Sequence, residues 1–121
     1  MDGLVINKKN NGDYLLLTFE AARLDPANCA LLQSELRAEL AGAPTDIIID
    51  MRGIAYAVSP AVNVILDAHE RCRAAGRSMI LIRLQPAVRR ILSLSGLGSL
   101  LIVRDDLKAA EALLARENNS N

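Results

Sequence analysis

The spacing of apolar residues changes several times along the chain, and each change predicts a helix or a strand. Ile47-Ile48-Ile49 is an unbroken β-branched run, which is typical of a strand buried on both faces of a sheet. Beyond Ser59 the apolar residues recur at helical spacing, and Gly76 is placed to end this helix in a left-handed conformation. The strand, the loop and the helix start therefore form the predicted centre of the fold.

The junction between this strand and this helix contains two residues that favour a helix start. Ser59 is the expected N-cap, because its hydroxyl can accept hydrogen bonds from the free amide groups of the first turn. Pro60 suits the first helical position, where a missing N–H costs nothing. The sequence thus predicts exposed polar groups at the end of a rigid element, where recognition sites are common.

The N-terminal part of the chain predicts a hairpin followed by a helix. Residues 3–8 and 13–19 have the composition of two strands, and the turn signal Asn-Asn-Gly-Asp at 10–13 lies between them. A helix is expected over residues 26–41, with Asp25 as its cap and leucines repeating near helical spacing.

The second half of the chain alternates strands and helices. The expected elements are a strand at 77–82, a short helix at 86–94, a strand at 100–103, and a last helix from Asp105-Asp106 to about residue 116. The full order is β-β-α-β-α-β-α-β-α. We therefore expect an α/β fold with a mixed β-sheet of about five strands, parallel at its centre, and about four helices. One domain is expected over 1–116, with a disordered tail at 117–121.

Composition narrows the classes of function. The chain has 121 residues, of which 51% are hydrophobic, and this suits one compact domain. Its formal net charge is zero and it has two Tyr, one Phe and no Trp, whereas a nucleic-acid surface needs basic and stacking residues. Neither a signal peptide nor a membrane anchor is predicted, since no apolar run approaches the roughly 20 residues of a spanning helix. We expect a soluble, cytoplasmic protein that binds neither nucleic acid nor membrane.

Residue types with catalytic or metal-binding chemistry are few and scattered. His69 lies within the helix after Ser59, where we expect it to be half-buried or solvent-facing. Cys29 and Cys72 are expected to be reduced core residues, and neither has a second ligand at metal-site spacing. Asp50, at the end of the central strand, is most simply an acid that caps a nearby loop. No enzyme activity, no metal and no cofactor is therefore expected.

Two further features have simple structural interpretations. Gly96-Leu97-Gly98 lacks the lysine of a phosphate loop, and it most simply contains a helix end with glycine in a left-handed conformation. Arg89-Arg90 beside Arg83 forms a small basic cluster, which we expect to be a solvated face rather than an anion site.

Three segments together resemble a known family. They are LDPANCALLQSEL at the first helix, IIIDMRGI before Ser59, and PAVRRILSLSGLGSLLIV over residues 86–103. They are similar to the STAS family, the domain of bacterial anti-sigma-factor antagonists, and the resemblance extends over residues 3–115. It implies a STAS-like fold and a non-catalytic module for signal transduction and transcription regulation. Its implied partner is an anti-sigma factor or a kinase-like regulatory protein.

The junction departs from the phosphorylation motif of this family. Members that act as switches have Asp-Ser-Ser-Gly-Leu-Gly there, and a partner kinase phosphorylates the second serine. The matching residues in this chain are Val58, Ser59, Pro60, Ala61, Val62 and Asn63. Because Pro60 has no hydroxyl, the resemblance implies a module that has lost the switch at its usual position.

Two alternatives stay open at the level of the sequence. In the first, Ser59 is the phosphoacceptor of an anti-sigma-type kinase, although Ser-Pro at a helix start needs no function to explain it. In the second, the domain binds a nucleotide or another small molecule, as some STAS domains are thought to do. The resemblance also implies partner contacts on the exposed face after the junction, which comprises Ser59, Asn63, Asp67, Glu70 and Arg71. Whether the chain forms a homo-oligomer is left open.

Overall fold

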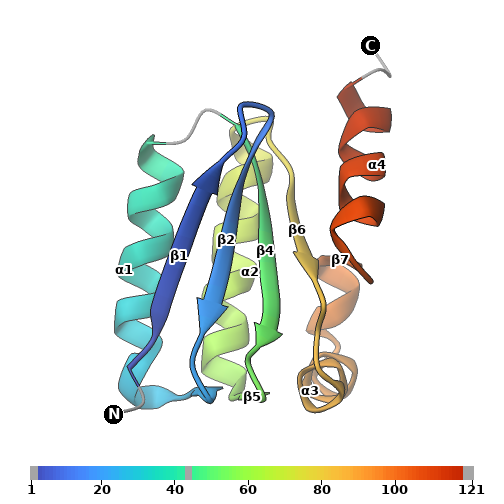
Figure 1. Ribbon diagram of the computed structural model, residues 1–121. Coiled ribbons are helices and arrows are strands. Elements are labelled where there is room, and N and C mark those ends of the chain that lie inside the picture. Colours follow the sequence, from blue (N-terminus) through green and yellow to red (C-terminus); the bar gives the residue numbers. More distant parts are fainter. Residues whose placement is uncertain (1–2, 43–44, 119–121) are drawn as a thin grey trace.

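The computed structural model, which describes residues 3–42 and 45–118, is built around a five-stranded sheet with strand order β1-β2-β4-β6-β7 (Figure 1). The strands are β1 (Val5–Asn10), β2 (Tyr14–Glu20), β4 (Asp46–Gly53), β6 (Met79–Ile82) and β7 (Ile102–Arg104). β1 is antiparallel to β2, whereas β2, β4, β6 and β7 run parallel to one another. The predicted α/β fold with a mixed sheet is therefore confirmed.

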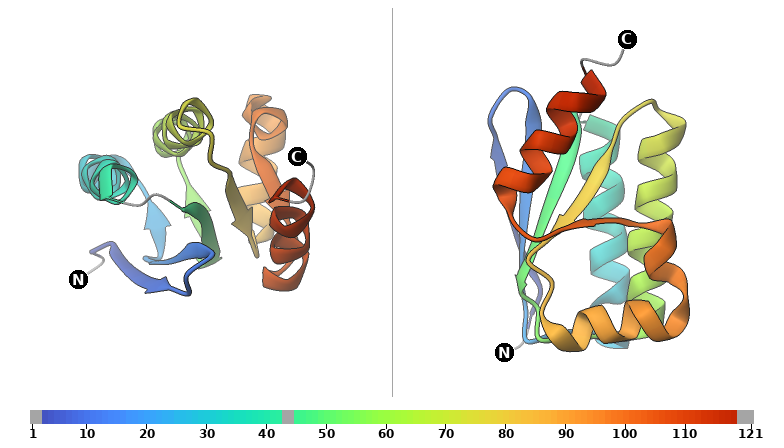
Figure 2. Two further views of the ribbon diagram at one scale, coloured as in Figure 1. Left: turned by 90° about the horizontal axis from the view of Figure 1, so that it is seen from above. Right: turned by 90° about the vertical axis from the view of Figure 1, so that its right-hand side faces the viewer.

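Helices cover both faces of this sheet. Within the described residues they are α1 (Pro26–Gly42), α2 (Ser59–Ala74), α3 (Pro86–Ser95), α4 (Leu107–Asn118) and a short 3-10 helix, η1 (Leu97–Leu100). α1 and α2 lie side by side on one face of the sheet, and α4 lies on the opposite face (Figure 2). None of the helices within 3–42 and 45–118 has the length and apolar content needed to span a bilayer.

The alternation of side chains along β4 divides the core into two clusters. Ile47 and Ile49 belong to the larger cluster, which α1 and α2 cover, whereas Ile48 belongs to the smaller cluster under α4. All three isoleucines are at most 1% exposed. The prediction of a strand buried on both faces is therefore confirmed.

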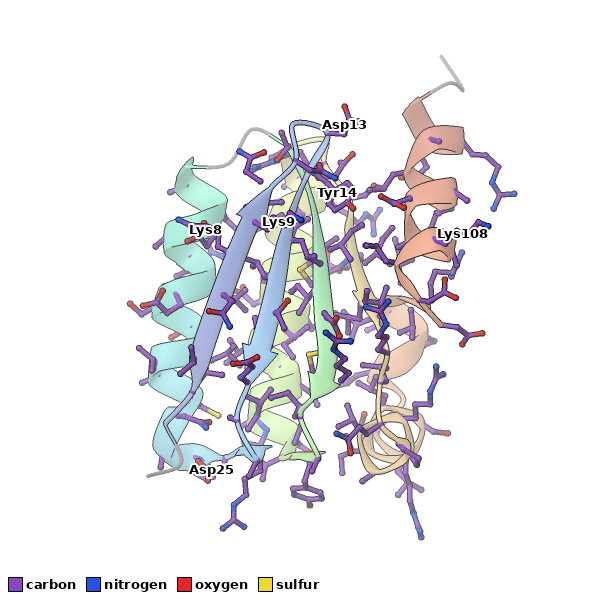
Figure 3. The ribbon with its side chains drawn as sticks, viewed as in Figure 1. Lys8, Lys9, Asp13, Tyr14, Asp25 and Lys108 are labelled. Atoms are coloured by element: carbon purple, nitrogen blue, oxygen red, sulfur yellow. The ribbon has the colours of Figure 1, made fainter. Side chains whose placement is uncertain are left out.

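Helix ends follow the predicted signals at three places. The Asp25 carboxylate accepts hydrogen bonds from the amide groups of Ala27 and Asn28 at 3.0 and 3.2 Å, and so it caps the start of α1 (Figure 3). Gly76 follows α2 and Gly96 follows α3, and each has a φ of +74°, in the left-handed region where glycine is favoured.

Most element boundaries differ from the predicted ones by one or two residues; β1, for example, covers residues 5–10 rather than 3–8. β6 begins at Met79 rather than at 77, because the amide of Arg77 still donates to the carbonyl of Cys72 at the end of α2. β7 begins at Ile102, because Leu100 belongs to η1. α4 extends to Asn118, two residues past its expected end, and the remainder of the expected tail, 119–121, lies outside the described residues.

A second, two-stranded sheet was not predicted. β3 (Arg23–Leu24) pairs in parallel with β5 (Tyr56–Ala57). Each of these strands has two residues, which is too short for any periodicity to mark it. The pairing joins the segment before α1 to the loop before α2.

β4 ends at a point where β2 approaches it closely. The register between the two strands shifts between Thr18 and Glu20, as in a β-bulge. A Cβ atom on Gly53 would lie 2.7 Å from the backbone oxygen of Phe19, which is too close for any side chain. Gly53 therefore permits the close approach of the two strands just before the chain leaves the sheet for the loop that leads to α2.

Candidate functional site

Backbone hydrogen bonds hold the loop between β4 and α2 in place. The amide of Ala55 donates to the carbonyl of Ala22 at 3.0 Å, and the amide of Val58 donates to the carbonyl of Leu24 at 2.9 Å. Just before Ala55, the side chain of Ile54 is fully buried in the larger core cluster. The pairing with β3 therefore fixes the position of the backbone just before α2.

The start of α2 contradicts the prediction that Ser59 is its N-cap. Val58 holds the N-cap position, with φ −83° and ψ 158°, and no side chain makes a capping hydrogen bond there. The carbonyl of Val58 already accepts from the amide of Ala61 at 3.0 Å, so the helix begins one residue earlier than expected. Ser59 is consequently the first residue of α2, Pro60 is the second, and both are exposed.

The exposed face of α2 brings together the residues predicted to contact a partner. Asn63, Glu70 and Arg71 are exposed and Asp67 is partly exposed, and their spacing of three and four residues places them on the same side as Ser59. The Asp67 carboxylate accepts from Nε of Arg71 at 2.9 Å. Two of the predicted contact residues therefore form an ion pair with each other on this face. The role of these residues in binding a partner stays a prediction.

Exposed apolar side chains on elements next to α2 were not predicted. Tyr56 in β5 is 45% exposed and Leu94 in α3 is 73% exposed. α3 contacts both β5 and α2, so both side chains belong to elements that adjoin the junction. Tyr56 lies in a largely apolar stretch and Leu94 stands between two serines, and neither context shows whether the side chain is exposed.

Asp50, at the end of β4, is part of a local ion-pair cluster. It is 2% exposed, and its carboxylate accepts from the backbone amide of Arg52 at 3.0 Å and from Nη1 of Arg83 at 2.9 Å. Asp50 was expected to cap a nearby loop, but the amide from which it accepts lies within β4, so its role is to hold the end of the strand and to pair with Arg83. The expectation that Arg83 belongs to a solvated face is wrong, because its guanidinium neutralises a buried carboxylate.

The residues with catalytic or metal-binding chemistry lie in the core or pack against it. His69 was expected to be half-buried or solvent-facing, but it is 3% exposed, since it shares the inward side of α2 with Ile65 and Cys72. Cys29 and Cys72 are free thiols, as predicted, and burial raises the pKa of Cys72 to about 11 and also raises the pKa of Cys29. Both cysteines therefore stay protonated near neutral pH. Residues 3–42 and 45–118 contain no group of three or more His, Cys, Asp or Glu side chains that could hold a metal ion.

Comparison with known proteins consistently finds one family. A family model described as the STAS domain matches residues 5–110. BtrV of Bordetella bronchiseptica, described provisionally as an anti-sigma factor antagonist, is 26% identical over 100 residues, which cover 83% of this chain and 86% of BtrV.

Solved structures give the same result for the fold. An anti-sigma-factor antagonist (STAS) domain protein from Planctomyces limnophilus matches with a TM-score of 0.82 at 17% identity, covering 91% of this chain and 97% of that protein. The anti-sigma factor antagonist SpoIIAA in its unphosphorylated form matches with a TM-score of 0.71 at 18% identity, covering 97% of this chain and 100% of that protein. At these identities the likeness shows a shared fold.

Proposed function

Because this chain belongs to the STAS domain family, we propose that it is a non-catalytic protein-interaction module that binds an anti-sigma factor. The observation that carries the proposal is the exposed face of α2, which starts at a junction held by the β3–β5 pairing. The similarity to BtrV supports this class of partner. In this role the protein acts in the cytoplasm, in signal transduction that regulates transcription.

An interface of this kind combines an apolar centre with a polar rim. Tyr56 and Leu94 provide large exposed apolar side chains, and Asn63 and Glu70 provide polar groups on α2. Asp67 is already paired on the surface, and exposed ion pairs contribute only about 0–1 kcal/mol. We therefore expect the apolar anchors to contribute more binding free energy than the charged residues of α2.

Binding without a phosphorylation switch follows from the residue at the second position of α2. The first turn of a helix has free amide groups and the positive end of the helix dipole, and both favour a phosphate group there. No side chain caps these amide groups in α2, but Pro60 has no hydroxyl that could carry a phosphate. The partner is therefore bound constitutively under this proposal.

One observation favours a second candidate function. The Ser59 side chain is exposed, and at the start of α2 there is no side-chain capping bond that would occupy its hydroxyl. A kinase of the anti-sigma type would then find an accessible hydroxyl in the first turn, one residue before the usual acceptor position. In that case the protein is a working switch with Ser59 as the phosphoacceptor.

The binding proposal is tested by titrating this protein with a purified anti-sigma factor from the same genome in a calorimeter. Tyr56→Ala should weaken binding at least tenfold, since truncating a central aromatic anchor commonly costs about 2 kcal/mol or more. The matched control is Lys108→Ala, an exposed residue of α4 on the opposite face of the sheet, which should change the affinity less than twofold (Figure 3). The proposal is wrong if Lys108→Ala weakens binding and Tyr56→Ala does not.

A further inference from the structure

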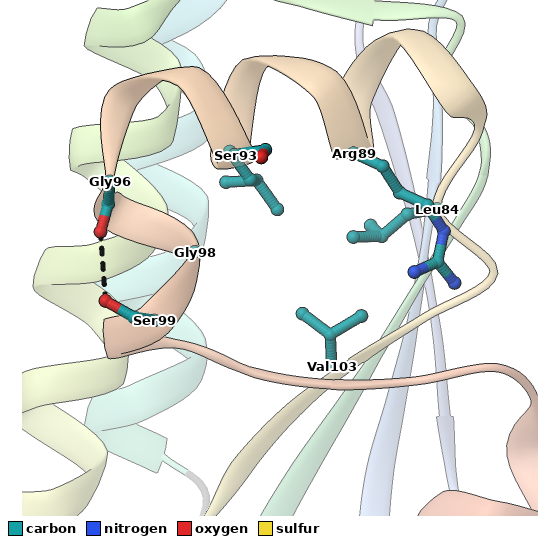
Figure 4. Close-up of a pocket in the computed structure, with 8 residues that line it drawn as sticks. Leu84, Arg89, Ser93, Gly96, Gly98, Ser99 and Val103 are labelled. Carbon is teal, nitrogen blue, oxygen red and sulfur yellow. Dashed lines mark hydrogen bonds between the residues drawn. The ribbon is translucent and has the colours of Figure 1, made fainter.

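A cavity of about 390 Å³ lies between α3, η1 and the last strand of the sheet (Figure 4). The lining residues come from the segment after β6, from α3, from the turn into η1 and η1 itself, and from β7. They are Leu84, Arg89, Leu92, Ser93, Gly96, Gly98, Ser99 and Val103. The candidate partner-binding residues of α2 are not among them. Any ligand of this cavity would therefore be an addition to the function proposed above.

The interior of the cavity is apolar and its shape is set by close backbone packing. Leu84 and Leu92 are each 6% exposed, and Val103 faces them from β7 (Figure 4). Gly98 packs tightly on α3, since a Cβ atom there would lie 3.2 Å from Cβ of Leu92. The turn at Gly96 and the close packing at Gly98 together bring η1 against α3 and close one side of the cavity.

Polar groups are found at two sides of this apolar interior. Arg89 and Ser93 are four residues apart on α3, so they lie on the same side of the helix, and both line the cavity (Figure 4). The Ser99 hydroxyl lies on the other side and donates to the carbonyl of Gly96 at 3.0 Å. One cationic group and one adjacent hydroxyl are therefore available to a ligand, next to an apolar surface.

The present partner of Arg89 does not hold its guanidinium strongly. Nη2 of Arg89 lies 3.2 Å from Oδ1 of Asp105, and the side chain of Asp105 is 90% exposed. An ion pair this accessible to water contributes little to stability, so a second carboxylate can replace Asp105 at small cost. The guanidinium can hold such a carboxylate through two parallel hydrogen bonds.

We propose that this cavity binds a small monocarboxylate with a short alkyl chain. The carboxylate would pair with Arg89 and accept from the Ser93 hydroxyl, while the alkyl chain would pack on Leu84, Leu92 and Val103. The volume lies near the lower end of the range of about 300–1,000 Å³ for ligand pockets, which favours a small ligand over a nucleotide. The single cation likewise matches one negative charge.

The experiment is a titration of the protein with octanoate, followed by nuclear magnetic resonance of the backbone amides. The natural protein should bind octanoate saturably, at least tenfold more tightly than the uncharged analogue 1-octanol, with shift changes centred on residues 84–103. Arg89→Gln should weaken octanoate binding at least tenfold. The matched control Arg90→Gln, an exposed arginine next in sequence that does not line the cavity, should change it less than twofold.

A second variant tests the place of binding independently of charge. Ser93→Phe adds a ring at an exposed helical position that lines the cavity, so it should block octanoate while the circular dichroism spectrum stays that of the folded protein. If Ser93→Phe does not fold, the comparison of Arg89→Gln with Arg90→Gln decides the question alone. The proposal is overturned if octanoate does not bind saturably, if 1-octanol binds equally well, or if the two arginine variants behave alike.

Discussion

Asp25 and Ser59 stand in the same sequence context, each immediately before a proline at the start of a helix, yet only Asp25 is an N-cap. Asp25 lies outside α1, where its carboxylate can turn back to the amides of the first turn. The amide of Val58 is bonded to β3, and this makes Val58 the cap residue of α2 and Ser59 its first helical residue. The tertiary hydrogen bond of Val58 could not be anticipated from the Ser-Pro pair.

Replacing Asp25 or Ser59 by alanine should change the free energy of unfolding by different amounts. Asp25→Ala should lower the free energy of unfolding by about 0.5–2 kcal/mol, because it removes a capping acceptor. Ser59→Ala should change the same quantity by less than about 0.5 kcal/mol, as is usual at exposed positions. Denaturant unfolding of both variants gives the comparison. Equal losses would show that the Ser59 hydroxyl does cap α2 in solution.

Replacing the proline tests the proposal that the phosphorylation switch has been lost at residue 60. Pro60→Ser should keep the fold, because the residue is exposed in the first helical turn, and the gain in freedom of the unfolded chain should cost less than about 1 kcal/mol. Together with Val58→Asp, which places an acid at the N-cap, we expect it to restore phosphorylation by an anti-sigma-type kinase at residue 60.

Phosphopeptide mass spectrometry on the natural and the doubly substituted protein measures phosphorylation at residues 59 and 60 directly. The natural protein should stay unmodified at the junction after treatment with the kinase. Efficient phosphorylation of natural Ser59 would contradict the loss of the switch and would establish the second candidate function in its place.

At the scale of elements, the path from β4 to α2 depends on elements that the sequence predicts and on long-range contacts that it does not. The strand and the helix are long and strongly patterned, so the sequence predicted both of them. The β3–β5 pairing and the close approach at Gly53 depend on contacts between segments about 30 residues apart in the chain, and these leave no local pattern. The position of Tyr56 on the candidate surface follows from the same pairing and was missed for the same reason.

The burial of individual residues on a helix was predicted less well than the helix itself. His69 was expected to be half-buried or solvent-facing, yet its position on α2 is on the inward side between Ile65 and Cys72. Helical spacing alone places residue 69 inward, four residues after Ile65 and three before Cys72. By contrast, Asn63, Glu70 and Arg71 were correctly placed at the surface, because spacing and polarity agree there.

Gly53→Ala tests whether the close approach of β2 and β4 sets the junction. The added methyl group would meet the backbone oxygen of Phe19 at 2.7 Å, so the strands must separate, and we expect a loss of about 1–3 kcal/mol in the free energy of unfolding. Gly42→Ala is the matched control, since a Cβ atom there meets nothing within 4 Å and alanine favours a helix. Thermal unfolding of both variants tests this. A Gly53→Ala protein as stable as Gly42→Ala would contradict the close approach.

At the scale of the whole molecule, α4 closes the second face of the sheet through Ala110 and Leu114, which pack on Ile48 and Ile80. Tyr14 joins this cluster, and its hydroxyl donates to the Glu111 carboxylate of α4 at 2.7 Å. This hydrogen bond links the first hairpin to the last helix, across almost the whole length of the sequence.

The Tyr14 contact should make the protein less stable as the pH rises into the alkaline range. Burial, then the hydrogen bond to Glu111, raises the pKa of Tyr14 from 10.0 to about 12. The folded state therefore favours the neutral phenol, whose contribution is complete below pH 10 and is lost as the pH rises from about 10 to about 12. Denaturant unfolding across this window should show a steeper loss for the natural protein than for Tyr14→Phe. Equal pH dependence in the two proteins would exclude this role for Tyr14.

The central claim, that the exposed face of α2 is the surface that binds an anti-sigma factor, is tested most directly by hydrogen exchange. The protein is measured alone and in complex with a purified anti-sigma factor from the same genome. We predict that the complex slows exchange over residues 59–71, at the face that carries Asn63, Asp67, Glu70 and Arg71. Slower exchange confined to residues 105–115, at α4 on the opposite face of the sheet, with residues 59–71 unchanged, would contradict the claim.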